Sequence, residues 1–184
     1  NNAATCLPRL LDMGIEPFLI ASTVRAVVGQ RLVRRLCQHC KVAYKPDDAT
    51  VKSIAQSFGI KTTAIMQYIN TLEEKAISGG IGVTDAASSK KMSSSPKAIL
   101  TLYRPNPEGC DECNHAGFKG RMGIYEVLDN SPEVQKLIIS NATSTVISDQ
   151  AIKEGMVPML IDGFVKALRG ETTAEEILRV TAEA

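Results

Sequence analysis

The sequence predicts a mainly α-helical chain with a small β component, which is an α+β fold. Two observations lead to this prediction. Apolar residues recur at helical spacing between helix start and stop signals over most of the chain, and only short runs are typical of strands. The 44% share of hydrophobic residues among 184 is enough for a real core in one or two small domains, so wholesale disorder is disfavoured.

The first 36 residues are expected to be helical. Residues 1–15 are typical of a helix that ends near Gly14. A second, longer helix is predicted from Pro17 to Leu36, because proline suits a first helical turn and the following residues keep a helical spacing. The residues at that spacing are Leu19, Thr23, Ala26, Val27 and Val33.

Residues 46–109 are predicted to form an insertion. Its first part is expected to be a short amphipathic helix containing Val51, Ile54, Ala55 and Phe58. A second short helix is expected to contain Ile65, Tyr68, Ile69 and Leu72. Residues 78–96 are rich in Gly, Ser and Lys and are predicted to be a mobile loop. These glycines do not make a phosphate-binding loop, because no Gly-Lys-Ser/Thr follows them. Residues 98–103 are expected to form a strand.

A strand over residues 121–128 and a run of helices complete the prediction. Ser131 is expected to cap a helix that has Pro132 at its first position. Helices are also predicted over residues 144–154 and 158–169, each followed by a glycine. The last helix is expected to begin with a capping box at residues 173–176. Its predicted buried residues are Ile177, Leu178 and Val180.

The cysteines are the most informative residues. Four of the five form Cys-x-x-Cys pairs, Cys37 with Cys40 and Cys110 with Cys113, and Cys6 is left over. An odd count disfavours a closed disulfide framework. The chain shows no signal-peptide pattern and no long uncharged apolar run, which favours a reducing cytosol. Two such pairs in that compartment are typical of structural zinc, which binds four thiolates in a tetrahedron.

Other residues near the pairs refine this prediction. Five cations lie close enough in sequence to offset part of the charge of a zinc tetrathiolate. They are Arg34, Arg35, Lys41, Lys119 and Arg121. His39 and His115 could each replace a thiolate, but four sulfurs already suffice, so both are expected to face solvent or bond to backbone. Cys6 is expected to be a small buried apolar residue. A redox dithiol is an alternative, weakened because a thioredoxin-like motif needs one pair between a strand and a helix.

The charge is nearly balanced overall, with 21 basic and 20 acidic residues, but it is unevenly placed. Residues 1–45 carry seven basic and two acidic side chains, and residues 127–184 carry five basic and nine acidic. Such a distribution suggests docking within the chain or between subunits, although solvated faces would explain it equally well. A nucleic-acid-binding zinc ribbon is another alternative. The near-neutral total and the few aromatic residues disfavour it.

Several blocks of the sequence resemble one family. Residues 11–18 (LDMGIEPF) and 30–34 (QRLVR) resemble the segment that follows the nucleotide site in the ATPases of type II secretion and type IV pilus assembly. Cys110-x-x-Cys113 with residues 117–126 (GFKGRMGIYE) resembles their second zinc knuckle and the strand after it. Their C-terminal helical signature is matched by residues 154–156 (EGM), 162–163 (DG), 170–173 (GETT) and 175–176 (EE).

The resemblance implies a C-terminal fragment of a RecA-like P-loop ATPase domain with a four-cysteine zinc module and a C-terminal helical bundle. Residues 1–36 would be the helical end of the ATPase core. Residues 37–120 would be the zinc-binding module with its insertion, and residues 121–184 the returning strand and the bundle. The family's phosphate-binding loop, acidic boxes and histidine box are not among these residues. ATP and magnesium are therefore expected in the full-length parent only, and the fragment is expected to be inactive alone.

For the parent, the resemblance implies a homo-hexamer at the cytoplasmic face of the bacterial inner membrane. It would act on an inner-membrane platform protein during pilin-like subunit movement or protein export, with no nucleic-acid partner and no insertion into the membrane. Arg31, Arg34 and Arg35 are candidates for contacts with a neighbouring subunit or with nucleotide. Alternatively, these arginines solvate a helix and balance the zinc thiolates.

Overall fold

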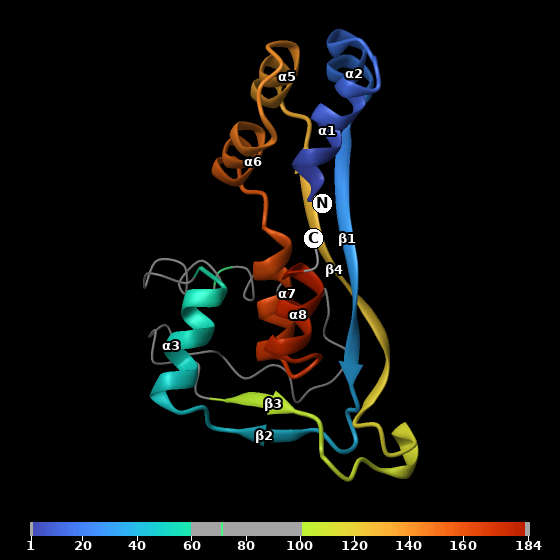
Figure 1. Ribbon diagram of the computed structural model, residues 1–184, viewed down its shortest axis with the longest axis vertical. Coiled ribbons are helices and arrows are strands. Elements are labelled where there is room, and N and C mark those ends of the chain that lie inside the picture. Colours follow the sequence, from blue (N-terminus) through green and yellow to red (C-terminus); the bar gives the residue numbers. More distant parts are fainter. Residues whose placement is uncertain (1, 60–70, 72–100, 183–184) are drawn as a thin grey trace. The chain divides into compact units, whose positions relative to one another are not determined.

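The computed structural model (Figure 1) describes residues 2–59, 71 and 101–182. Helices and strands are both present, as an α+β chain requires. The chain divides into two compact units, which are described one after the other. Unit 1 is formed by Asn1–Leu32 and Gly123–Asp162, and unit 2 by Val33–Met122 and Gly163–Glu183. No described helix is both long and apolar enough to cross a membrane.

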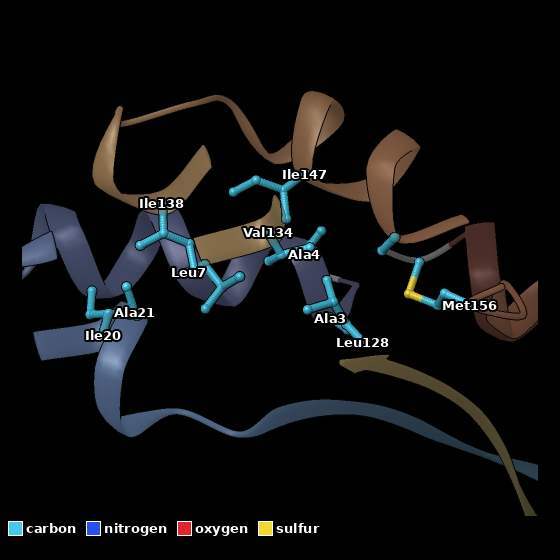
Figure 2. Close-up of a cluster of buried hydrophobic side chains, with 11 residues drawn as sticks. Ala3, Ala4, Leu7, Ile20, Ala21, Leu128, Val134, Ile138, Ile147 and Met156 are labelled. Atoms are coloured by element: carbon cyan, nitrogen blue, oxygen red, sulfur yellow. The ribbon is translucent and has the colours of Figure 1, made fainter. Parts of the chain in front are cut away.

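The core of unit 1 lies between helices. They are α1 (Ala3–Asp12), α2 (Pro17–Thr23), α5 (Pro132–Ile139) and α6 (Ser144–Lys153). Helix α2 packs against α5, and α1 packs against α6. Their facing sides bury a cluster of apolar side chains, shown in Figure 2. Its members are Ala3, Ala4, Leu7, Ile20, Ala21, Leu128, Val134, Ile138, Ile147, Ala151 and Met156.

The ends of these helices follow the signals in the sequence. The side chain of Asn2 accepts a hydrogen bond from the amide of Thr5 at 3.0 Å and so caps α1. Ser131 caps α5 in the same way, with a 3.2 Å bond from the amide of Val134. Gly14 and Gly155 follow α1 and α6 with φ angles of +83° and +109°, which favour glycine. The helices predicted over residues 1–15, after Ser131 and over residues 144–154 are therefore confirmed as α1, α5 and α6.

The long helix predicted from Pro17 to Leu36 is wrong. Helix α2 ends at Thr23, Val24 takes an extended conformation, and strand β1 (Ala26–Leu36) follows. Along β1 the more exposed and the more buried residues alternate, which is the period of a strand. Valines are frequent here, and their branched Cβ disfavours a helix and suits a strand. The helical spacing of a few apolar residues was therefore a misleading signal.

Strand β4 (Phe118–Asp129) pairs with β1 and is longer than the predicted 121–128. Within unit 1 its Ile124, Glu126 and Leu128 are buried. The Glu126 carboxylate accepts hydrogen bonds from the amide of Ala3 and, at 3.2 Å, from the amide of Met159. These amides belong to the first residues of α1 and of α7 (Met159–Leu168). One buried carboxylate thus caps the starts of both helices, where a negative charge is favoured.

Unit 2 contains a small two-stranded sheet and a helical part. Strand β2 (Val42–Tyr44) pairs antiparallel with β3 (Leu102–Arg104), with Ala43 opposite Tyr103. Helix α3 (Asp48–Ser57) is the first predicted helix of the insertion. The ring of Phe58 after it packs against the ring of Phe164 of α7, with ring centres 4.8 Å apart and planes tilted by 42°. Of the strand expected over 98–103, residues 102 and 103 lie in β3, residue 101 precedes it, and residues 98–100 lie outside the described residues. The four residues named for the second predicted helix, Ile65, Tyr68, Ile69 and Leu72, and the loop predicted over 78–96 lie outside the described residues.

The last predicted helix is α8 (Ala174–Ala182), which buries Ile177 and Val180 while Leu178 is half-buried. Half of the predicted capping box is present, because the hydroxyl of Thr173 accepts a 3.2 Å hydrogen bond from the amide of Glu176. The carboxylate of Glu176 does not return to Thr173. It turns instead to two arginines, and this contact belongs to the site described next.

Candidate metal centre

Both Cys-x-x-Cys pairs converge in unit 2. The four sulfur atoms of Cys37, Cys40, Cys110 and Cys113 all lie within 4.8 Å of one another. The Cys37–Cys110, Cys40–Cys113 and Cys110–Cys113 sulfur pairs are each 3.7 Å apart. That spacing is far too long for a disulfide bond, but sulfurs at the corners of a tetrahedron with metal–sulfur bonds of about 2.3 Å lie about 3.8 Å apart. The four residues therefore fit a tetrahedral metal ion such as zinc.

The second knuckle is a short 3₁₀ turn at Asp111–Cys113. The sulfur of Cys113 accepts hydrogen bonds from the amides of Cys110 and Gly117, each at 3.3 Å. Glycine is required at Gly109, because a Cβ there would lie 2.4 Å from the backbone of His115. The backbone of this segment is thus folded around its sulfurs, and its amides point at the negative charge that a thiolate carries.

The first knuckle follows directly from the end of β1. The amide of Cys37 donates a 3.0 Å hydrogen bond to the carbonyl of Gly117, so a backbone hydrogen bond links the first knuckle to the second. The amide of Lys41 returns to the carbonyl of Cys37 at 2.9 Å and closes the turn. Pairing between β1 and β4 therefore brings together two cysteine pairs whose members Cys37 and Cys110 are 73 residues apart.

The thiols differ in their affinity for protons. Burial raises the pKa of Cys113, but the amide hydrogen bonds from Cys110 and Gly117 oppose it and bring the pKa to about 6. Burial and hydrogen bonds from the other cysteines raise the pKa of Cys40 to about 12. A bound divalent metal would favour the thiolate form of all four, which is the form that a metal binds.

Lys119 and the two histidines, His39 and His115, are residues near the cysteine pairs for which the sequence made predictions. Lys119 pairs with Glu112 at 2.7 Å, and its pKa is raised first by that partner and further by the charges of Cys37 and Cys110. His39 is exposed, and His115 bonds the carbonyl of Glu108 at 2.9 Å, so neither histidine is needed as a ligand.

Cys6 was expected to be buried, and this prediction is wrong. Its side chain is exposed on α1, whose inward face is formed by Ala3, Ala4 and Leu7. A cysteine is among the most buried residue types on average, but its position on the helix decides its exposure here. Cys6 also lies outside the four-sulfur cluster.

Arg34 braces the metal module against α8. Its guanidinium pairs with Glu176 at 2.5 Å and lies 4.2 Å from the ring centre of Phe118. The amide of Arg34 also bonds to Glu176 at 3.2 Å, and its carbonyl accepts from the hydroxyl of Thr172. Arg179 adds a second cation to the same carboxylate at 3.1 Å. The sequence placed Glu176 in a capping box and in the C-terminal helical signature, but its contact with Arg34 was not foreseen. The acidic last part and the basic first part of the chain were the available signal for such a pair.

The three predicted contact arginines fall in different surroundings. Arg34 is engaged in the brace just described, which joins the basic first part of the chain to its acidic last part. The Nε atom of Arg35 is buried and has no hydrogen-bond partner among the described residues. Arg31 is half-buried. A contact of Arg31, Arg34 or Arg35 with nucleotide or with a neighbouring subunit stays a prediction.

We expect Glu176→Gln to destabilise unit 2 by roughly 2–4 kcal/mol at neutral pH. The hydrogen bond from Arg34 lowers the pKa of Glu176 to about 2 despite the burial of the carboxylate. Because the folded-state pKa is below that of an ordinary Glu, this contribution is complete above about pH 4.5 and is lost as the pH falls towards about 2. Denaturant unfolding at several pH values, with metal in excess, measures the difference. The exposed neighbour Glu175→Gln is the control. Equal losses of stability in both variants would contradict a stabilising role of the pair formed by Glu176 and Arg34.

Comparison with known proteins assigns the chain to a family. The sequence profile described as "Type II/IV secretion system protein" matches residues 1–179. The chain is 34% identical to the type IV pilus assembly ATPase PilB of Thermus thermophilus, covering 100% of this chain and 16% of that protein. It is also 34% identical to PilB of Pseudomonas aeruginosa, over 100% of this chain and 25% of the relative. The type II secretion system ATPase E of Vibrio cholerae is again 34% identical, over 100% and 28%. The chain thus spans well under a third of these relatives, and it belongs to the type II/IV secretion system protein family.

Proposed function

We propose that the chain is the C-terminal, zinc-binding part of a hexameric ATPase that powers protein secretion or pilus assembly. The observation that carries this proposal is the convergence of four cysteine sulfurs in a chain that matches the family along almost its whole length. Four sulfur ligands leave no open position on zinc, which is the arrangement of a structural site. The metal would hold the module together, and ATP and magnesium would bind to the full-length parent.

An exposed apolar face supports the proposal that a RecA-like ATPase domain continues beyond these residues. In unit 1, Val28 of β1 and Val127 of β4 are 59% and 53% exposed. Leu32 and Tyr125 are exposed as well, and Gln30 reaches the hydroxyl of Tyr125 at 3.4 Å from the same face. Apolar side chains gathered on one face of a sheet are usually covered by another layer. The remainder of the ATPase domain is the proposed layer.

The hexamer would work at the cytoplasmic face of the inner membrane. The relatives are named for type IV pilus assembly and for type II secretion, which supports a motor of one of these machines. A module fixed by a metal ion is rigid without a large core of its own. It is therefore suited to transmit movement of the motor to an integral membrane platform protein.

The proposal is tested on the full-length parent and on the isolated chain together. We expect the parent to hydrolyse ATP and the isolated 184 residues to show no hydrolysis above a Cys113→Ala control, because they contain no phosphate-binding loop. In cells, Cys113→Ser in the parent should abolish pilus assembly or secretion, whereas Cys6→Ser should not. ATP turnover by the isolated chain, or salt-dependent binding of DNA or RNA to it, would contradict the proposal.

A further inference from the structure

The turn that joins α7 to α8, residues 169–173, lies beside the start of the first cysteine knuckle in unit 2. The amide of Leu36 donates a 2.8 Å hydrogen bond to the carbonyl of Glu171. The hydroxyl of Thr172, which is fully buried, donates at 2.8 Å to the carbonyl of Arg34. The turn thus runs along the last residues of β1, immediately before the cysteine at which the knuckle begins.

Two side chains of the knuckle itself reach the turn. Gln38 lies between Cys37 and Cys40, and Lys41 follows them. The carbonyl of Gly170 accepts a 3.1 Å hydrogen bond from the side-chain amide of Gln38 and a 3.0 Å bond from the ammonium group of Lys41. That ammonium group also donates to the side-chain oxygen of Gln38. We refer to the Gly170 carbonyl and the side chains of Gln38 and Lys41 together as the knuckle clasp.

The backbone at Gly170 makes this close approach possible. Gly170 is buried, and its φ angle of +69° is one that glycine favours. A Cβ on this residue would lie 2.8 Å from ring atoms of Tyr103 and 3.0 Å from the ammonium group of Lys41. That ammonium group lies 4.9 Å from the centre of the Tyr103 ring, which is within the range of a cation–π contact. A larger residue at position 170 would therefore displace one of the groups that form the contact.

The clasp gives Lys41 a role different from the one expected from the sequence. A cation near a thiolate cluster could act through its charge alone, and its hydrogen-bond partners would then not matter. The ammonium group of Lys41 instead donates to a backbone carbonyl and to a neutral side-chain amide. Both acceptors belong to the contact between the knuckle and the turn. The structure therefore connects Lys41 to the position of the turn.

We propose that Gln38 and Lys41 are positioning residues through which the metal centre and the α7–α8 turn stabilise each other. This inference rests on the metal-binding role proposed above. Zinc binding by the first cysteine pair would fix the short backbone segment that carries both side chains, and so keep them at Gly170. The turn would in return keep that segment in the shape that binds metal, because the coupling between two sites is equal in both directions.

The zinc affinity of the 184-residue chain is the first test. Gln38→Met with Lys41→Met removes every hydrogen-bond donor of the clasp and keeps side chains of similar length. We expect competition with a chelator to show roughly tenfold weaker zinc binding, because residues that orient metal ligands contribute about 10–100-fold to the affinity. Lys41→Arg, which keeps the charge and the donors, should retain most of the affinity. Lys45→Met removes an exposed lysine of the same segment and is the matched control, which should change little.

Amide hydrogen exchange on the zinc-loaded proteins is the second test, and a role limited to charge would not alter it. The amide of Leu36 bonds to the turn, and the amide of Glu176 bonds to the hydroxyl of Thr173 at the start of α8. We expect both amides to exchange about tenfold faster in the double variant with zinc still bound. The amides of Ile138 and Ile147 in the core of unit 1 should exchange as before, which shows that the variant is folded.

The two single variants separate position from charge. Because the side chains share one acceptor and bond to each other, the double variant should lose less zinc-binding free energy than the two single variants lose together. Losses that add would indicate that Lys41 acts through its charge alone and would overturn the proposal. Unchanged exchange at Leu36 and Glu176 in the zinc-loaded double variant would overturn it as well. In both cases zinc bound by the unaltered chain would still support the proposed function, whereas an unaltered chain that binds no zinc would contradict both.

Discussion

Cys113→Ser is expected to remove the metal from the chain and to unfold the knuckles of unit 2. The chain should contain one zinc ion, and the variant close to none, because a three-sulfur site loses most of its affinity. Structural zinc contributes binding free energy on the order of 10 kcal/mol, and that energy stabilises the fold. Cys113 is also buried, and its sulfur accepts two amide hydrogen bonds, so the substitution disturbs the turn as well.

Elemental analysis and thiol titration measure this effect. In the metal-loaded chain only Cys6 should react quickly, since it is exposed and outside the cluster. A chelator should then release zinc and expose four further thiols. Cys6→Ser is the matched control and should keep its zinc. A metal-free chain whose cysteines cycle readily between thiol and disulfide would instead support the redox alternative.

Glu126→Ala is expected to destabilise unit 1 by about 2–5 kcal/mol. The substitution leaves the amides of Ala3 and Met159 without their acceptor at the starts of two helices, and each unpaired buried amide costs about 1–3 kcal/mol. Loss of the negative charge near both helix starts adds to the effect. Amide hydrogen exchange should therefore accelerate in the first turn of α1. Glu133→Ala, an exposed acid on α5, is the control, and equal exchange in both variants would contradict the prediction.

Gly29 provides an independent check on the same carboxylate. A Cβ at Gly29 would lie 2.9 Å from Cγ and 3.2 Å from Oε1 of Glu126, so glycine leaves the space that this side chain fills. Gly29→Ala should destabilise unit 1 for that reason. In the Glu126→Ala background the added methyl group meets a vacated space. The double variant should therefore lose less stability than the two single variants lose together.

The parts of the structure that could be predicted from the sequence are those specified by neighbouring residues. Ser131, Gly14 and Gly155 mark helix ends through local hydrogen bonds or through a φ angle that glycine favours, and all three act as expected. The cysteine pairs also carry their own chemistry in a short motif, so four converging sulfurs could be foreseen although Cys37 and Cys110 are 73 residues apart.

The failures have a common physical origin. Residues 24–36 contain apolar residues that fit either a helical or a strand period, and pairing with β4 decides between them. That partner is about a hundred residues distant, so no local pattern reveals it. Likewise the role of Glu126 depends on two amides that come from other parts of the chain, and the role of Glu176 on Arg34. Such contacts are set by tertiary structure.

The separation of the two knuckles has a consequence for how this family can vary. Once four sulfurs and a metal join the ends, the segment between them is a closed loop whose entropy changes slowly with length. Doubling such a loop costs only about 0.6 kcal/mol, which is small beside the energy of a zinc site. Loop-closure entropy therefore sets little limit on the number of residues between the knuckles. The limits come instead from specific contacts within residues 46–109, such as the pairing of β3 with β2 and the packing of Phe58 against Phe164. A change of length that spares these contacts would give related machines different attachments without rebuilding their motor.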